Sequence, residues 1–232
     1  MRTFISLLRL GESGLSGEGL GGLGVKVVRS GVDEAEVLRR TRETEIRCRV
    51  DAEPRRSWRI HTGINFLDHM LEILAFYSGF NLDVEVKASR RLLHTIIEDV
   101  GITLGKAFHV LAFERVKAYG IKGFGFSQGV LDEAFSDARI SFEGRVGCYI
   151  DRDRRVRSFE LVEDVDERFL ESFFQGFSQG MRATIHVDLR RGDDPHHLWE
   201  SAFRAFGGAL REALSRDEWK KGSIAGIKET MD

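Results

Sequence analysis

Two histidine–glutamate pairs with the same spacing lie about 100 positions apart in the chain. They are His94 with Glu98 and His196 with Glu200. In a helix, residues four positions apart lie on one face about 6 Å apart, so each pair can reach one metal ion. Imidazole together with carboxylate suits manganese, iron, zinc, cobalt or nickel better than magnesium or calcium. The pairs therefore predict transition-metal binding.

A metal site needs more ligands than one helix supplies, and the further candidate is His69, which lies in another expected helix. His197 follows His196 directly and points toward a different ion or partner. Asp68 and Asp99 flank the set and could accept hydrogen bonds from the ligand histidines. Taken alone, each pair is also typical of a solvated helix surface, and His69 of a core histidine. The repetition of the pair favours the metal site.

The elements that must position these residues recur in the same order in two halves. Each half is expected to contain an antiparallel hairpin, a helix, a strand, a loop and a second helix. In the first half these are the hairpin 44–50 with 58–61, the helix 66–76, the strand 82–86 and the helix 94–116. In the second half they are the hairpin 138–142 with 146–150, the helix 166–178, the strand 183–189 and the helix 196–214.

This recurrence predicts an α+β fold of two tandem-duplicated halves, each a sheet with two helices. The repeats are expected over about 39–118 and 119–215, within a single domain of residues 31–232. Half of the residues between 11 and 24 are glycine. Because glycine loses the most backbone entropy on ordering, residues 1–30 are expected to form a flexible tail.

Composition excludes several classes of protein. The 35 Lys and Arg against 37 Asp and Glu give a formal net charge of −2, so the chain lacks the basic field that nucleic-acid binding needs. No apolar stretch approaches the roughly 18 residues of a membrane span. The two cysteines are too few for a disulfide framework and fit a reducing compartment. We expect no nucleic-acid partner, no membrane association and a cytoplasmic location.

Several motifs together resemble the imidazoleglycerol-phosphate dehydratase family. GINFLDHML (63–71) and HHLWESAF (196–203) are specific, and EDVGITLG (98–105) supports them. The resemblance runs from about residue 39 to residue 227. It implies a lyase of histidine biosynthesis that dehydrates imidazole glycerol phosphate to imidazole-acetol phosphate. It also implies a fold with helices between the sheets, a homo-oligomer of 24 subunits, and two manganese ions per active site held between subunits.

The resemblance also implies roles for individual residues. One ion would be bound by His69, His196 and Glu200, and the other by His94, Glu98 and His197. The phosphorylated imidazole substrate would be contacted by Glu43, Arg145, Arg204 and Ser223, of which Ser223 binds phosphate. Glu43 is the predicted proton-transferring carboxylate, since the reaction must move a proton from carbon.

Four departures from the family pattern bear on metal and phosphate binding. Thr95 and Ser172 stand where histidine ligands are expected, and Gly123 and Ala225 where a phosphate-binding arginine and lysine are expected. These departures are the basis of an alternative, a non-catalytic or repurposed metal-binding oligomeric paralogue. A two-metal hydrolase on the same scaffold has less support, because no nucleophile motif accompanies the metal residues.

Overall fold

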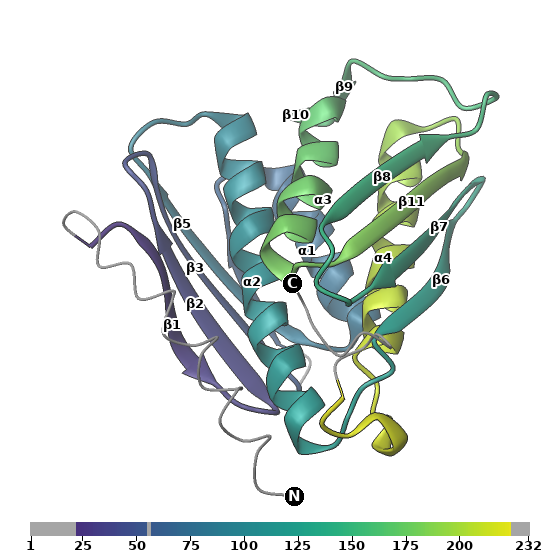
Figure 1. Cartoon of the computed structure of the whole chain (residues 1–232). Helices are drawn as coiled ribbons and strands as arrows, with labels where there is room; N and C mark the ends of the chain where they lie inside the picture. Colours follow the sequence, from purple (N-terminus) through teal and green to yellow (C-terminus); the bar gives the residue numbers. More distant parts are fainter. Residues whose placement is uncertain (1–21, 55–56, 224–232) are drawn as a thin grey trace, which may run out of the picture.

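Four helices lie between two β-sheets in the computed structural model (Figure 1), which describes residues 22–54 and 57–223. The first sheet has the strand order β1 (Gly24–Ser30), β2 (Glu34–Arg40), β3 (Thr44–Asp51), β5 (Asn81–Ala88) and β4 (Trp58–His61). The second has the order β6 (Phe124–Leu131), β7 (Ala134–Ser141), β11 (Thr184–Arg191) and β8 (Gly147–Arg152). A short ribbon pairs β9 (Leu161–Val162) with β10 (Val165–Asp166).

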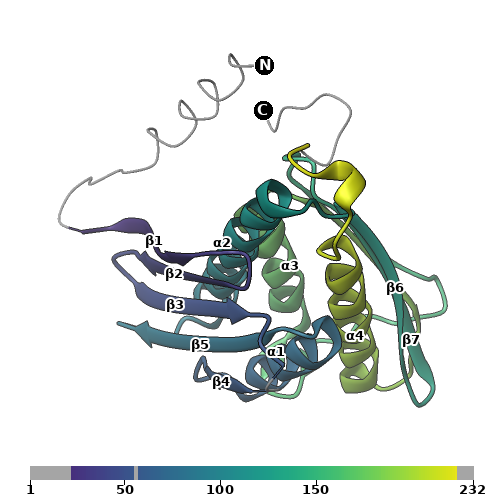
Figure 2. The same cartoon turned by 90° about the horizontal axis from the view of Figure 1, so that it is seen from below.

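The helices are α1 (Asn65–Ser78), α2 (Leu93–Ala118), α3 (Glu167–Met181) and α4 (Pro195–Ala213), followed by the 3₁₀ turn η1 (Glu218–Lys220). Seen from below, the helices fill the space between the sheets (Figure 2). None of the described helices is long and apolar enough to cross a membrane.

The two halves have the same topology. The order β2-β3-β5-β4 in the first sheet matches the order β6-β7-β11-β8 in the second. In each half a strand, a helix and a parallel strand follow one another, as β4-α1-β5 and as β8-α3-β11. A second helix, α2 or α4, then closes the half. The predicted α+β fold of two duplicated halves with helices between the sheets is confirmed.

The two expected hairpins are wrong. β3 pairs with β2 and β5, whereas β4 pairs in parallel with β5. Likewise, β7 pairs with β6 and β11, and β8 lies parallel to β11. The helix after β4 or β8 carries the chain back to the end of the sheet where that strand began. The next strand therefore runs parallel to it. Alternating hydrophobicity identifies a strand but does not say which strand pairs with it.

The N-terminal boundary also differs from the expectation. Residues 24–30, placed in a flexible tail by composition, form β1 and pair antiparallel with β2. The valines after Gly24, which favour a strand, begin where the glycine run ends. Residues 1–21 of the expected tail lie outside the described residues. The first repeat, expected from about residue 39, already includes β2 from Glu34.

Glycines let α2 and α3 pack with their backbones in contact. A Cβ atom on Gly105 would lie 2.3 Å from the carbonyl oxygen of Phe177, and one on Gly180 would lie 2.0 Å from that of Ile102. Gly101 on α2 makes the same approach to Phe173, one turn earlier on both helices. Because the contacts advance together along both helices, α2 and α3 run parallel. Only glycine fits at these positions without moving a helix.

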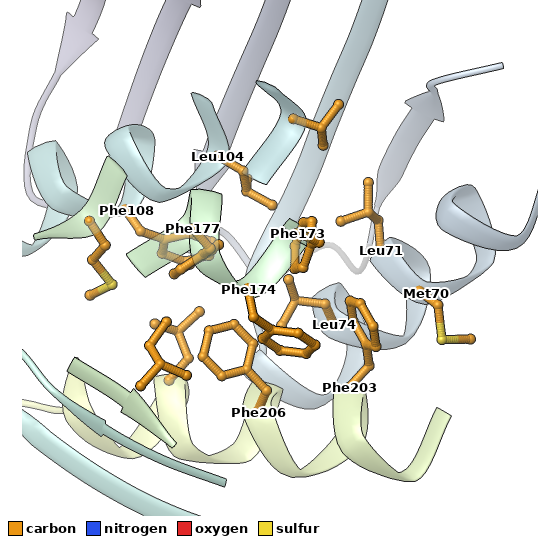
Figure 3. Packing of buried hydrophobic residues seen from close by; sticks show 14 of the residues in the cluster. Met70, Leu71, Leu74, Leu104, Phe108, Phe173, Phe174, Phe177, Phe203 and Phe206 are labelled. Carbon is orange, nitrogen blue, oxygen red and sulfur yellow. The ribbon is translucent and has the colours of Figure 1, made fainter. Parts of the chain in front are cut away.

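Aromatic side chains fill the space between the helices (Figure 3). Phe173, Phe174, Phe177, Phe203 and Phe206 are fully buried. Phe177 and Phe206 meet edge to face with ring centroids 5.0 Å apart, the preferred geometry of aromatic pairs. The core thereby fixes α3 against α4.

His109 on α2 is a largely buried histidine. Its Nδ1 lies 2.9 Å from the carbonyl oxygen of Met181, and the rings of Phe113 and Phe142 pack against it. Burial, with the positive charges of Lys106 and Arg182, lowers the pKa of His109 from 6.5 to about 4.

We therefore predict that acid weakens the fold through His109. In the unfolded chain His109 takes up a proton below about pH 6.5, whereas in the folded chain it does so only near pH 4. The free energy of unfolding therefore falls as the pH drops through this window. The loss from this group should be on the order of 2 kcal/mol, less than the full shift because the ring is partly exposed. Urea unfolding of His109→Gln should show a weaker pH dependence, and exposed His61→Gln should not. Equal pH dependence in both variants would contradict the assignment.

Candidate functional site

All four helices begin at the same end of the molecule, near the β9–β10 ribbon (Figure 1). At the start of α1, the ring of Phe66 lies 5.2 Å from that of His196 at the start of α4. Asp164, just before α3, accepts hydrogen bonds from the backbone of Asn65 and Phe66. Since α2 runs parallel to α3, the first turns of all four helices gather at this end.

At this end His69, His196 and Glu200 converge. The Nε2 atoms of His69 and His196 lie 3.1 Å and 3.3 Å from the same oxygen, Oε2 of Glu200. One ligand atom from each residue lies within 4.8 Å of the others. These are the three residues that the resemblance assigns to one ion, brought together within one chain. Two imidazole nitrogens and a carboxylate oxygen are a donor set that fits a divalent transition metal.

The other oxygen of Glu200 is bound by Arg204, one turn further along α4. Arg204 Nε lies 3.0 Å from Glu200 Oε1, and Nη1 donates to the carbonyl oxygen of Val130 at 2.7 Å. Burial alone would raise the pKa of Glu200, but the hydrogen bonds from Arg204 and His69 outweigh it and lower the pKa below its ordinary value. Glu200 is therefore held as a carboxylate although its side chain is only 7% exposed.

Two glutamates outside the predicted set contact the Nδ1 atoms of the two α4 histidines, His196 and His197. Glu163 Oε1 lies 3.0 Å from His196 Nδ1, and Glu133 Oε2 lies 2.9 Å from His197 Nδ1. The hydrogen bond with His197 and those from the backbone of Asp194 and Asp193 lower the pKa of Glu133 to about 2. The same hydrogen bond raises the pKa of His197.

Sequence reasoning assigned no role to either glutamate. Glu133 follows Asp132 in a tight turn between β6 and β7, and no spacing rule links it to His197, 64 residues away. Asp68 and Asp99, the expected acceptors, serve elsewhere. Asp68 accepts from the backbone and hydroxyl of Thr62, and Asp99 binds Arg39 and Thr44. Within the described residues neither carboxylate contacts His69, His94, His196 or His197, so that expectation is wrong.

The second predicted set does not close within the described part of the chain. His94 Nε2 lies 4.0 Å from Glu98 Oε2, and both side chains are about half exposed. His197 is on α4 and is bound to Glu133. Within residues 22–54 and 57–223, the group of His69, His196 and Glu200 is the one metal-ligand cluster with three members.

The duplication explains why one set closes and the other stays open. Phe66-Leu67-Asp68-His69 on α1 corresponds to Phe169-Leu170-Glu171-Ser172 on α3. His94 packs against Phe169 at 5.4 Å and 66°, as His196 packs against Phe66 at 5.2 Å and 64°. Ser172 therefore occupies the position equivalent to His69. Its hydroxyl donates to the carbonyl oxygen of Arg168 at 3.2 Å and is directed back to its own helix.

The remaining predicted site residues lie at both ends of the molecule. Glu43, in the β2–β3 turn, accepts at its backbone oxygen from the amide of Ser89, which precedes α2, so it lies at the end where the helices begin. It lines a surface pocket with Arg40, Arg42, Lys87 and others.

Two predicted substrate residues lie at the opposite end. Arg145 is in the β7–β8 turn, where its carbonyl oxygen accepts from Thr184 after the end of α3. Ser223 follows Gly222, whose amide donates to Val116 in the last turn of α2. Gly123 is also at this end, with its amide bonded to the carbonyl oxygen of Ala213. Thr95 lies in the first turn of α2, and Ala225 lies outside the described residues.

Known proteins resemble this chain over most of its length. A family model for imidazoleglycerol-phosphate dehydratase matches residues 62–210. The imidazoleglycerol-phosphate dehydratase of Aromatoleum aromaticum is 42% identical over 203 residues, covering 85% of this chain and 99% of that protein. That of Methylibium petroleiphilum is 38% identical over 198 residues, covering 85% and 96%.

Solved structures agree with these relatives. The crystal structure of IGPD from Pyrococcus furiosus in complex with (S)-C348 has a TM-score of 0.67 and 29% identity, covering 83% of this chain and 98% of that one. The imidazoleglycerol-phosphate dehydratase of Staphylococcus aureus has a TM-score of 0.67 and 28% identity, covering 79% and 99%. The resemblance predicted from the motifs is confirmed, and the chain belongs to the imidazoleglycerol-phosphate dehydratase family.

Proposed function

We propose that this chain is a metal-dependent hydro-lyase that dehydrates imidazole glycerol phosphate to imidazole-acetol phosphate in histidine biosynthesis. Family membership supports the reaction. The observation that carries the metal dependence is the convergence of His69, His196 and Glu200 at one end of the helices.

We propose manganese, or another divalent transition metal, as the cofactor. His69, His196 and Glu200 would hold one ion, and His94, Glu98 and a neighbour's copy of the His197 position would hold the other. When bound, such ions stabilise negative charge on the substrate ring, which eases removal of the neighbouring carbon-bound proton.

Other residues of the chain would align the ligands, transfer the proton and bind the phosphate. Arg204 keeps Glu200 ionised and aligned, so that Glu200 Oε2 faces both imidazoles. Glu43 is exposed at the same end of the molecule and is the proposed carboxylate that accepts and returns the proton. Arg145 and Ser223 would hold the phosphate away from the reacting carbon, so that binding of the phosphate orients the ring.

This division of labour requires an assembly of chains. Arg145 and Ser223 lie at the opposite end from His69 and Glu200, so one chain cannot present all four to one small substrate. The separation of His197 from the open His94–Glu98 pair within one chain has the same implication. We propose that the active site forms between copies of the chain in a homo-oligomer, with the 24-subunit assembly of the resemblance as its expected size.

The first prediction from this proposal concerns the closed ligand set. His69→Ala and Glu200→Gln should each lose roughly 100-fold or more in kcat/KM, because each removes one of three protein ligands. The measurements are formation of imidazole-acetol phosphate with manganese, and metal content by elemental analysis. His61→Ala, an exposed histidine on β4, is the matched control and should keep both. Metal binding by the wild type without turnover would instead favour the repurposed paralogue.

The second prediction concerns the open set. Ser172→His should place a third ligand beside His94 and Glu98, as His69 lies beside His196 and Glu200. Co²⁺ at this second site should bind more tightly than in the wild type in a calorimetric titration. Ser172→Ala should leave the affinity unchanged. If Ser172→His also leaves it unchanged, the proposed equivalence of Ser172 and His69 is wrong.

The third prediction tests the shared active site by mixing variants. Arg145→Ala and Glu200→Gln should each be nearly inactive alone, and their co-expressed mixture should regain activity, because an intact Arg145 and an intact Glu200 can then meet from different chains. A mixture of His69→Ala with Glu200→Gln should stay inactive, since both ligands must come from one chain. Recovery in the second mixture, or none in the first, would contradict the proposed assembly.

A further inference from the structure

The turn between β9 and β10 contacts two helices of the site. It consists of Glu163 and Asp164, and neither belongs to the predicted ligand set. Glu163 has a φ of 54°, in the left-handed region that a non-glycine residue adopts only at a cost. The surrounding structure therefore has to stabilise this conformation. The side chains of this turn contact His196 and the start of α1.

Glu163 holds the ring of His196. Its Oε1 lies 3.0 Å from His196 Nδ1, and the opposite ring nitrogen, Nε2, lies 3.3 Å from Glu200 Oε2. Both carboxylates can accept from the ring, and the shorter contact, with Glu163, favours the proton on Nδ1. Nε2 is then the nitrogen left to face Glu200, and it would be the atom that meets a bound metal ion. An outer carboxylate of this kind fixes both the tautomer and the orientation of a ligand histidine.

Asp164 holds the start of α1. Its Oδ2 accepts from the amide of Asn65 at 3.0 Å, and its Oδ1 from that of Phe66 at 3.1 Å. These are first-turn amides with no acceptor inside the helix. Ile64, at the position before the helix, offers no side-chain cap, so Asp164 supplies it from almost 100 residues away. His69 lies one turn further along the same helix.

We infer that the Glu163-Asp164 turn is a positioning clamp for the metal ligands, an inference that rests on the proposed metal dependence. Glu163 orients His196 on α4 while Asp164 anchors α1, which carries His69. Because the two residues are adjacent and the turn is strained, the two helices cannot shift apart without breaking one contact. The clamp thereby keeps both Nε2 atoms directed at Glu200 before any metal arrives.

The test is a Co²⁺ titration of the full-length protein, followed by calorimetry and by the visible absorption bands of bound Co²⁺. Glu163→Ala should weaken binding about 10- to 100-fold. Glu163→Gln keeps an acceptor for Nδ1 and should weaken it less. Asp164→Ala should weaken it about five-fold through the loss of the helix cap. Glu160→Gln removes the same charge three residues earlier, from an exposed side chain, and should change neither the affinity nor the spectrum.

Hydrogen exchange of the metal-free protein separates positioning from damage to the fold. Asp164→Ala should speed exchange at the amides of Asn65 and Phe66, while Glu163→Ala should leave α1 and the urea midpoint unchanged and still weaken Co²⁺ binding. If the wild type binds no Co²⁺ at this site, the proposed metal dependence fails, and the clamp with it. If the wild type binds and both alanine variants bind equally well, only the clamp is overturned. Loss in only one variant would overturn the two-armed clamp and confine the role to that arm.

Discussion

The close parallel packing of the helices is the constraint on which the candidate site depends. Gly105 and Gly180 let α2 and α3 touch backbone to backbone, and the buried phenylalanines fix α3 against α4. The two βαβ units send α1 and α3 in the same direction, and α4 and α2 run parallel to them, so the first turns of all four helices collect at one end. Residues far apart in the sequence, such as His69 and Glu200, meet there because the helices cannot slide along one another.

At that end of the molecule, the Glu200 carboxylate contacts both the histidines and an arginine. One oxygen faces two imidazoles and the other binds Arg204, which preserves the negative charge in a nearly buried position. A buried carboxylate without such partners would take up a proton and lose its attraction for a cation. Arg204 was expected to contact the substrate. Its hydrogen bonds to Glu200 and Val130 give it a structural task that does not depend on substrate.

The sequence was sufficient for the duplication, which follows from local patterns, and for the family, which follows from its motifs. The grouping of His69 with His196 and Glu200 came from the family resemblance, and the structure brings these three side chains together. Helical spacing relates His196 to Glu200, and recurrence reveals the matching His94 and Glu98. Strand pairing could not be predicted, since alternation is the same whichever strand lies alongside. Contacts between turns and helices could not be predicted either. Nothing in the composition near Glu163 indicates that its carboxylate lies 3.0 Å from a histidine 33 residues later.

Acidic residues at the helix starts offset the positive ends of the helix dipoles in the candidate site. The positive ends of the dipoles point toward this region. Carboxylates cap three of the four helices: Asp194 caps α4, Asp166 caps α3 and Asp164 caps α1. Glu200 is then free to face the histidines. Leu92 gives α2 no such cap, and α2 carries the open pair, His94 and Glu98. The two helices with capped starts that pair with each other, α1 and α4, are thus the ones that bring His69, His196 and Glu200 together.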